Sequence, residues 1–273
     1  MGLRIQNNIA AMNAHRQLTI SDAGLSKSLE KLSSGYRINR AADDAAGLSI
    51  SQAFRADIAS YKAAARNTTE ASALLQVAEG AMDQIGNMLT RLKELATQAA
   101  SANAAANLDK IDAEAQELLG EMQRIATSSE YGGTALLDGT FAAAVFQVGA
   151  KNQADNQLSI SLGDAQTAAL GVDALSLATT AGAQTALDLV DTAIGTLNGV
   201  RGDIGAYMNR LSYAAANLAS TIENVQAAES VIRDVDMAAE MTTFTKNQIL
   251  LQAGTAMLAQ ANMAPQQVLS LFG

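Results

Sequence analysis

Few side chains in this sequence could carry out catalysis or bind a metal. The single histidine, His15, lies near one end of the chain, where a lone imidazole is a poor base or ligand. Asp43 and Asp44 form a pair of carboxylates, but no nucleophile, basic clamp or glycine-rich phosphate loop accompanies them. We therefore interpret this pair as capping or packing residues at the start of a helix.

Two further features argue against enzyme chemistry. Asp234 and Asp236 could suggest a calcium loop, but the glycine and the terminal glutamate that such loops need are missing. The chain has no cysteine, which excludes thiolate nucleophiles, thiolate metal sites and disulfides. We predict that the protein is not an enzyme, has no catalytic residue or metal site, and needs no cofactor.

Composition favours long helices and limits the classes of partner. The 273 residues include one proline and no tryptophan, and Ala, Leu, Met and Gln lose little rotamer freedom in a helix. A formal net charge of −9 argues against a nucleic-acid partner. No run of apolar residues is long enough to span a membrane, and the N-terminus has no signal-peptide pattern. Export, if it occurs, should not use a cleaved signal.

Apolar residues recur at alternating spacings of three and four, the pattern of helices that pack as a coiled coil. In the longest run, only Arg201 and Glu229 interrupt the pattern. A shorter run over residues 18–32 ends near Gly35, residues 36–47 are expected to form a connector, and helix should resume near Leu48. The three main runs are Leu75, Ala78, Met82, Ile85, Leu89, Leu92 and Ala96; Leu108, Ile111, Ala115, Leu118, Met122 and Ile125; and the alternating positions from Leu187 to Ile232.

The period changes between about residues 129 and 180. Tyr131-Gly132-Gly133 predicts a turn, and Leu158, Ile160 and Leu162 alternate with polar residues as in a strand. With the apolar stretch around residues 141–148, this pattern predicts a β-hairpin that should lie against the helices, because a strand pair is too small to be a domain alone.

Both ends of the chain carry apolar residues on what we predict to be one side of a helix. Chain ends are normally polar and frayed, so apolar ends need a partner, either each other or neighbouring subunits. We predict an assembly interface made of Leu3, Ile5, Ile9, Met12, Leu18, Leu25, Leu29 and Leu32 at one end, and of Phe244, Ile249, Leu251, Met257, Leu258, Leu269 and Leu271 at the other.

Four glycines, Gly195, Gly199, Gly202 and Gly205, lie inside the longest heptad run. Each lowers helix stability by about 1 kcal/mol relative to alanine. Two interpretations stay open: close packing against another helix, or a softening of the helix that lets a filament bend.

Long stretches at both ends resemble the bacterial flagellins. They are Leu-Arg-Ile-Gln-Asn-Asn-Ile-Ala-Ala-Met-Asn-Ala at residues 3–14, Leu-Ser-Ser-Gly-Tyr-Arg-Ile-Asn-Arg-Ala-Ala-Asp-Asp-Ala-Ala-Gly-Leu-Ser-Ile-Ser at residues 32–51, and the 231–273 tail ending in Leu-Ser-Leu-Phe-Gly. The resemblance covers about residues 1–140 and 185–273. Only about 45 residues separate the two halves, where many flagellins insert large outer domains. The chain is therefore similar to a short flagellin.

The resemblance, together with the heptads, predicts a mainly α fold: an elongated antiparallel helical bundle or coiled coil of N- and C-terminal helices with a small β-hairpin region. Five segments are expected. Residues 1–40 and 236–273 should be the two halves of an inner core of assembly helices, residues 41–140 and 186–235 the two halves of a helical rod, and residues 141–185 a short hairpin and connector.

The resemblance implies a secreted, extracellular subunit that leaves the cell by type III export and polymerises into the flagellar filament for motility. It also implies contacts with hook-associated and cap proteins, an export chaperone on the C-terminal tail, and an animal innate immune receptor. The residues that match the family's receptor contacts are Arg91, Leu95 and Glu114. Alternatives are a hook–filament junction protein, a flagellin-like fusion with an enzyme, and a coiled-coil secretion or adhesion protein.

Assembly is the mechanism that these patterns favour. An isolated helix of about 35 residues with an apolar stripe is marginal without packing. We predict that residues 1–40 and 237–273 fluctuate in the monomer and fold when subunits stack. Head-to-tail contacts that do not close into a ring would then generate a helical filament.

Overall fold

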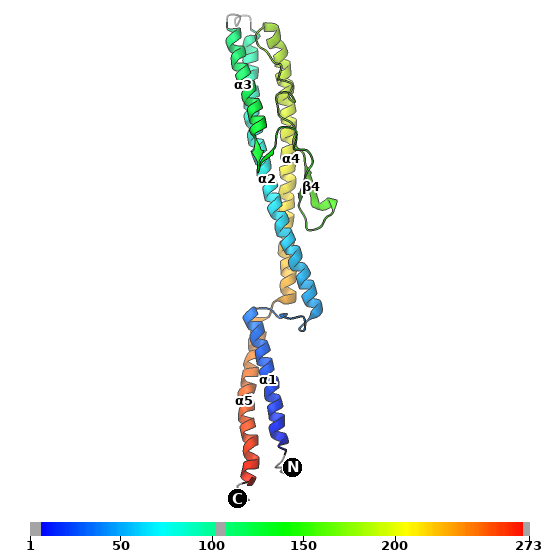
Figure 1. The fold of residues 1–273 in the computed structure, drawn as a ribbon, viewed down its shortest axis with the longest axis vertical. Helices are drawn as coiled ribbons and strands as arrows, with labels where there is room; N and C mark the ends of the chain where they lie inside the picture. Colours follow the sequence, from blue (N-terminus) through cyan, green and yellow to red (C-terminus); the bar gives the residue numbers. More distant parts are fainter. Residues whose placement is uncertain (1–6, 102–106, 270–273) are drawn as a thin grey trace. The chain divides into compact units, whose positions relative to one another are not determined.

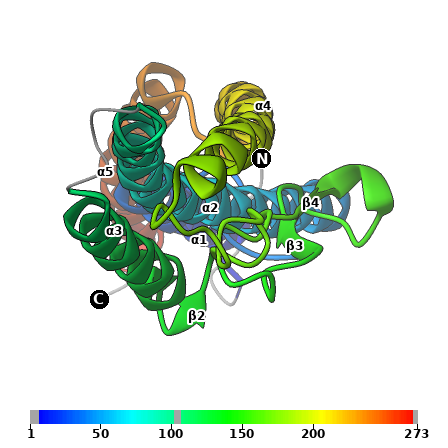
Figure 2. The same cartoon turned by 90° about the horizontal axis from the view of Figure 1, so that it is seen from above.

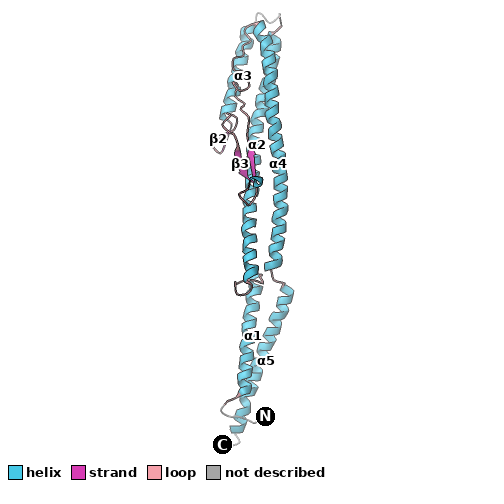
Figure 3. Cartoon of the chain, turned by 90° about the vertical axis from the view of Figure 1, so that its right-hand side faces the viewer, coloured by secondary structure: helices cyan, strands magenta, loops and turns pink. Residues whose placement is uncertain are grey.

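The computed structural model describes residues 7–101 and 107–269, with side chains as far as Met263. Helices make up most of it, as Figure 3 shows. The predicted mainly α fold with a small β region is confirmed. In chain order (Figure 1) the elements are α1 (Ile9–Ser34), α2 (Ala45–Ala99), α3 (Leu108–Ser128), β1 (Glu130–Tyr131), β2 (Thr134–Ala135), β3 (Ala144–Gln147), the 3-10 helix η2 (Ala154–Asn156), β4 (Gln157–Ile160), α4 (Thr180–Arg233) and α5 (Met237–Leu269).

Contacts divide the chain into two compact units. Unit 1 consists of Met1–Ala56 and Asn224–Gly273, and unit 2 is Asp57–Glu223. Helices α2 and α4 each contribute residues to both units. None of the helices in the described part of the chain has the length and apolar character needed to cross a membrane.

The part of α2 that belongs to unit 2 forms one wall of a dry core. All seven residues of the first predicted heptad run, from Leu75 to Ala96, are fully buried. The spacing of three and four places them on one side of the helix, where they face α3 and α4. The heptad prediction for this helix is therefore confirmed at every position.

Helix α4 packs antiparallel to α2 in unit 2. Val190, Leu197, Ile204, Leu211 and Leu218 follow one another at seven-residue intervals and are buried. The interruption at Arg201 has a polar explanation, because its guanidinium lies 2.7 Å from a Glu79 carboxylate oxygen and 3.2 Å from one of Asp83. These carboxylates raise the pKa of Arg201, with Glu79 the larger cause.

Two antiparallel strand pairs follow α3. In the first, β1 pairs with β2 around Gly132 and Gly133, whose φ values of 60° and 81° suit a tight turn that only glycine adopts readily. In the second, β3 pairs with β4 from Ala144↔Ile160 to Gln147↔Gln157. Both the predicted turn and the predicted hairpin are confirmed.

The β3–β4 hairpin lies to one side of the helices of unit 2, as Figure 2 shows. Leu158 and Ile160 point into the core, whereas Gln157 and Ser159 are exposed, as the alternation predicted. The Asn67 side chain of α2 donates a hydrogen bond to the Gln147 carbonyl over 3.2 Å, which ties the hairpin to the helix.

The irregular segment between β4 and α4 is also part of the core, which the sequence patterns did not predict. Its apolar residues Leu162, Leu170, Val172, Leu175 and Leu177 are buried. Polar side chains of α3 hold its backbone: Gln116 donates to the Leu175 carbonyl over 2.8 Å, and Asp112 accepts from the Leu177 amide over 2.5 Å.

In unit 1, α1 and α5 lie side by side (Figure 1). Asn8 caps the start of α1, since its side chain accepts from the Ala11 amide over 3.0 Å, and Gly35, which has a left-handed φ of 73°, caps its end. Helix α2 begins at Ala45, three residues before the predicted Leu48, because the Asp44 carboxylate accepts the Gly47 amide over 2.8 Å and caps the helix there.

Candidate subunit-assembly surface

The two terminal helices meet along a seam with coiled-coil spacing. At each seam position of α1 and α5 the side chain is half-buried, or buried in the case of Ser21 and Ser28. The alternation of three and four keeps these residues on the facing sides of the two helices. The seam consists of Ala11, Ala14, Leu18, Ser21, Leu25, Ser28 and Leu32 on α1, and of Glu240, Phe244, Asn247, Leu251, Gly254, Leu258 and Ala261 on α5.

Four residue pairs, each joining α1 or its capping residue Asn8 to α5, fix the antiparallel register of the seam. Asn8 donates from its amide to the Ala261 carbonyl over 2.8 Å, and Lys31 lies 3.4 Å from a Glu240 carboxylate oxygen. Between these ends, two glycines allow close approach. A Cβ on Gly254 would lie 3.0 Å from Leu18 Cδ1, and one on Gly24 would lie 3.0 Å from Asn247 Nδ2.

The seam buries little apolar surface. Among the described side chains of α1 and α5, only Ser21 and Ser28 are buried, at 4% and 3% exposure. In the rest of described unit 1, Ile38 is the one large hydrophobic side chain that is buried. A helix pair held by half-buried leucines and serines has a weak hydrophobic contribution to its stability.

Large apolar side chains remain on the outside of the pair. The sequence pattern predicted that α5 is apolar on one side only. This prediction is wrong, because large apolar side chains of α5 lie opposite the seam as well as in it. A helix that is apolar around most of its circumference is normally buried. The exposed set is Ile9, Met12, Ile20 and Leu29 on α1, and Met237, Met241, Ile249, Leu250, Met257 and Met263 on α5.

The predicted assembly residues therefore fall into three groups. Leu18, Leu25, Leu32, Phe244, Leu251 and Leu258 lie in the seam. Ile9, Met12, Leu29, Ile249 and Met257 are exposed. Leu3, Ile5, Leu269 and Leu271 lie outside the described side chains.

The connector after α1 pairs with the connector before α5. Tyr36 and Asp234 form an antiparallel bridge, the Arg37 amide donates to the Arg233 carbonyl over 2.6 Å, and the Val235 amide donates to the Gly35 carbonyl over 3.0 Å. The Arg233 guanidinium lies 4.2 Å from the centre of the Tyr36 ring, a cation–π distance. Within unit 1, this joint holds together the end of α1 and the start of α5.

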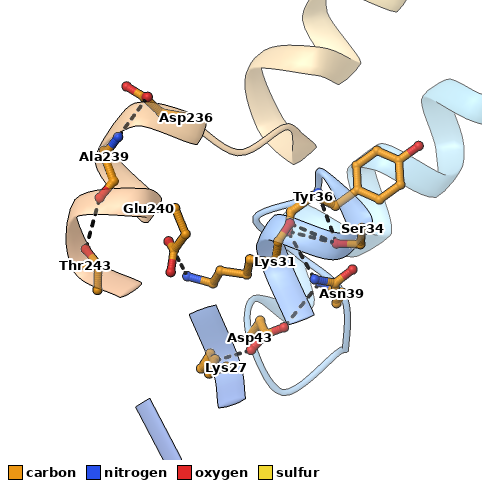
Figure 4. A network of polar contacts seen from close by, with 10 residues as sticks. All are labelled: Lys27, Lys31, Ser34, Tyr36, Asn39, Asp43, Asp236, Ala239, Glu240 and Thr243. Atoms are coloured by element: carbon orange, nitrogen blue, oxygen red, sulfur yellow. Dashed lines mark hydrogen bonds and ion pairs between the residues drawn. The ribbon is translucent and has the colours of Figure 1, made fainter. Parts of the chain in front are cut away.

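Two of the carboxylates discussed in the sequence analysis, Asp43 and Asp236, lie near this joint and bind backbone amides there (Figure 4). Asp43 lies 2.8 Å from Lys27 and accepts the amides of Asn39 and Arg40 over 3.2 and 3.1 Å. The Lys27 contact and then these amides lower the pKa of Asp43 from 3.8 to about 2. Asp236 accepts the Ala238 amide over 2.9 Å at the start of α5.

Together with the bond from the Gly47 amide to Asp44 at the start of α2, the contacts of Asp43 confirm the capping and packing interpretation of these two residues. His15 is exposed on α1. In residues 7–101 and 107–269, no three acidic or histidine side chains are grouped closely enough to hold a metal ion.

The predicted receptor residues lie in unit 2. Arg91 on α2 is paired with Glu114 on α3 over 2.8 Å and with Glu94 over 2.9 Å, and these partners raise its pKa, Glu114 more than Glu94. Both Arg91 and Glu114 are exposed, whereas Leu95 is 2% exposed and belongs to the core. The surface at this place is therefore polar.

Sequence reasoning missed the small and polar half of the seam. Gly24, Ser21, Ser28, Asn247 and Gly254 are not apolar in type, so they add nothing to the apolar periodicity on which the prediction rests. The signal was present, since the spacing from Leu18 to Leu32 continues through Ser21 and Ser28 without a break.

Comparison with known proteins agrees with this architecture. The model of the bacterial flagellin N-terminal helical region matches residues 5–142, and that of the C-terminal helical region matches residues 187–272. A flagellin of Halalkalibacterium halodurans is 42% identical over 98% of this chain and 99% of its own length. A flagellin of Bacillus subtilis is 40% identical over 99% of this chain and 100% of its own length.

A solved structure is also similar. The crystal structure of Bacillus cereus flagellin is 32% identical, with a TM-score of 0.51, and the match covers 60% of this chain and 94% of that one. The helical regions on both sides of the short middle segment are thus shared with these proteins. The chain belongs to the bacterial flagellin family.

Proposed function

We propose that α1 and α5 form the surface by which this flagellin adds to its filament, and that their pair becomes fully ordered only when neighbouring copies cover it. The family makes the chain a structural subunit of the extracellular flagellar filament, used in motility, and not an enzyme. The proposal concerns which part of the chain assembles and how.

One observation carries the proposal: large apolar side chains gather, uncovered, on the terminal helices. Ile249 and Met257 are 59% and 64% exposed, although each lies on a helix that already pairs with another. Complete burial of such a side chain is worth roughly 1.5–3 kcal/mol, so covering one that is about half-exposed would contribute roughly 1 kcal/mol. Several such side chains per subunit would together favour assembly strongly.

The same observation supports folding on assembly. Of its described side chains, the seam buries two serines, and it leaves its leucines and Phe244 half-exposed. Helices without substantial tertiary packing are marginal in water. The neighbouring copies would supply the apolar contacts that unit 1 does not supply from its own described residues.

Seeded elongation tests the assembly surface. Ile249→Ser on α5 and Val145→Ser on β3 form a matched pair, because both side chains are 59% exposed. We expect Ile249→Ser to raise the critical concentration for growth on sonicated filament seeds by roughly tenfold, or about 1.4 kcal/mol. Val145→Ser should change it much less. Equal effects of the two substitutions would contradict the proposal.

Hydrogen exchange tests the folding step. In the monomer, amides of α1 and α5 should exchange much faster than those of α2 within unit 2, and they should become protected in the filament. Terminal helices that were already as protected as α2 in the monomer would rule out folding on assembly, while leaving the assembly surface itself in place.

The hook–filament junction alternative predicts a different product. A junction protein would form a short segment, whereas a filament subunit should elongate into long polymers. The flagellins that match this chain over nearly their whole length favour the filament subunit. Electron microscopy of the purified, self-assembled protein distinguishes the two.

An export chaperone and an immune receptor are finer proposals that rest on the family. If a receptor binds near Arg91, the exposed Arg91 and Glu114 would contact it, and buried Leu95 would only position their helix. Arg91→Ala should then weaken stimulation of receptor-bearing cells more than the control Lys93→Ala.

The export chaperone is tested with a truncated chain. Loss of residues 235–273 should abolish binding of the chaperone to this protein.

A further inference from the structure

The methionines of this chain are distributed unevenly between the two units. In unit 2, Met82 and Met122 are fully buried, and Met88 and Met208 are half-buried. In unit 1, every described methionine is exposed: Met12 (65%), Met237 (50%), Met241 (48%), Met257 (64%) and Met263 (50%). We refer to these last residues as the exposed methionine set.

The exposed methionine set contributes a large part of the proposed assembly surface. On α5 it supplies most of the large apolar side chains that point away from the seam, the others being Ile249 and Leu250. Met241, Ile249 and Leu250 also line one open, mainly apolar depression on this helix. Flexible, polarisable methionine side chains adapt well to a neighbouring surface that forms only on binding.

Methionine is also the oxidisable sulfur of this chain. The sequence has no cysteine and no tryptophan, so a two-electron oxidant has no thiol to attack first. A peroxide transfers one oxygen atom to the thioether: the S–O bond forms, the O–O bond breaks, sulfur is oxidised, and the peroxide is reduced to water or an alcohol. Exposure determines which methionines react, which directs this reaction to unit 1.

We propose that the exposed methionine set makes the assembly surface sensitive to oxidation, so that peroxide converts an assembly-competent subunit into one that cannot add to a filament. This inference rests on the proposed function of α1 and α5. A sulfoxide oxygen needs a hydrogen-bond partner, and an apolar neighbour that covers it provides none. The change is reversible, because methionine sulfoxide reductases restore the thioether.

The location of the set predicts a difference between free and assembled protein. In the monomer the five thioethers are open to solvent. In the filament, neighbouring copies would cover them. Oxidation should therefore block growth from new subunits while leaving filaments that have already formed largely intact.

The test uses full-length protein, hydrogen peroxide and sonicated seeds of the same protein. Peptide mass spectrometry should show sulfoxide at the exposed methionine set before it appears at Met82 or Met122. We expect oxidised monomer to have a critical concentration for elongation at least roughly tenfold higher than untreated monomer, and reductase treatment to reverse this change. Assembled filaments should show much slower oxidation at the same residues.

A matched pair of variants locates the effect. Leucine at all five positions of the set (Met12→Leu, Met237→Leu, Met241→Leu, Met257→Leu and Met263→Leu) alters the assembly surface itself, so its critical concentration is compared before and after peroxide within the same variant. Peroxide should leave that critical concentration unchanged, because no oxidisable sulfur remains at these positions. The control, Met88→Leu with Met208→Leu in unit 2, should elongate and stay sensitive. Unchanged elongation of oxidised wild type, or equal sensitivity of the two variants, would overturn the inference.

The oxidation of assembled filaments separates this inference from the proposed function. If the exposed methionine set reacts as quickly in filaments as in monomer, neighbouring copies do not cover it, and the proposed assembly surface is wrong. If the set is protected in filaments but oxidised monomer still elongates, the assembly surface stands and only its sensitivity to oxidation is excluded.

Discussion

Helices α2 and α1 carry leucines at the same heptad spacing, but they bury them to very different extents. In unit 2, Leu75, Leu89 and Leu92 of α2 are completely buried against α3, α4 and the segment that follows β4. In unit 1, Leu18, Leu25 and Leu32 of α1 lie in the seam with α5 and are only half-buried. The same sequence pattern thus produces a finished core in one unit and an unfinished one in the other.

The difference shows what a heptad pattern can and cannot specify. The pattern determines which side of a helix is apolar, but the number of partners around the helix determines how much of that side is buried. Unit 2 packs α3 and most of α2 and α4 together with the segment that follows β4, whereas the seam of unit 1 pairs α1 with α5. In a subunit that polymerises, an incomplete core leaves apolar surface available to the next copy.

The largest expected difference between the units is the loss of unfolding free energy when one leucine in each is truncated to alanine. Leu89→Ala should lower the free energy of unfolding of unit 2 by roughly 2–5 kcal/mol, because the site is closed and leaves a cavity. Leu25→Ala should lower that of unit 1 by about 1 kcal/mol or less in the monomer, since the side chain is already partly in water. Denaturant titration with hydrogen exchange reports each unit separately.

In the filament, we expect the effect of Leu25→Ala on unit 1 to be larger than in the monomer. Once neighbouring copies cover the terminal helices, Leu25→Ala should become more destabilising, which would appear as dissolution of filaments at a lower denaturant concentration. If Leu25→Ala and Leu89→Ala had equal effects in the monomer, unit 1 would have a complete core and the comparison would fail.

Glycine-to-alanine changes should give a smaller contrast. Gly199 on α4 has open space where a Cβ would lie, so Gly199→Ala should stabilise unit 2 by about 0.5–1 kcal/mol. Gly254 faces Leu18, whose Cδ1 would be 3.0 Å from the new Cβ, so Gly254→Ala should gain less or should destabilise the seam. Thermal unfolding of the two monomeric variants measures both effects.

The same variant separates the two interpretations of the glycines of α4. Gly195, Gly199, Gly202 and Gly205 all face open space within the described part of the chain, so close packing against its other helices does not explain them. If they pack against a neighbouring copy, Gly199→Ala should weaken filament growth even though it stabilises the monomer. If they soften the helix, growth should be normal and filament stiffness should increase.

The sequence predicted unit 2 better than unit 1, and the reason is physical. The α2 heptads, the turn at Gly132 and the β3–β4 hairpin each depend on local periodicity, which single residues report directly. The α1–α5 seam depends on the partner, because a serine such as Ser28 becomes a buried seam residue only when the facing helix is known.

The joint between the connectors was also beyond prediction. It depends on Tyr36 meeting Arg233, almost 200 positions along the chain, through a backbone bridge and a ring contact that leave no periodic signal. By contrast, the capping role of Asp44 could be predicted, since an aspartate three residues before a helical amide is a local arrangement.

The smallest expected effect concerns the charge that orders this joint. The pKa of Asp43 in the folded state is about 2, against an ordinary value of 3.8, because Lys27 and two backbone amides contact its carboxylate. A lowered pKa stabilises the folded state above the ordinary pKa, and this stabilisation is lost as the pH falls from about 4 through about 2. The connector around Asn39 and Arg40 should therefore be ordered at neutral pH and loosened in strong acid.

Asp43→Asn tests this dependence. The amide side chain cannot form the ion pair with Lys27, so at pH 7 the amides of Asn39 and Arg40 should lose protection against hydrogen exchange relative to wild type. The difference between the two proteins should shrink as the pH is lowered from 4 to 2, where wild type also loses its charge. The control Asp22→Asn, which changes an exposed carboxylate on α1, should show no such convergence. A protection difference that stayed constant down to pH 2 would mean that the amide contacts, which asparagine can keep in part, order the connector and that the charge does not.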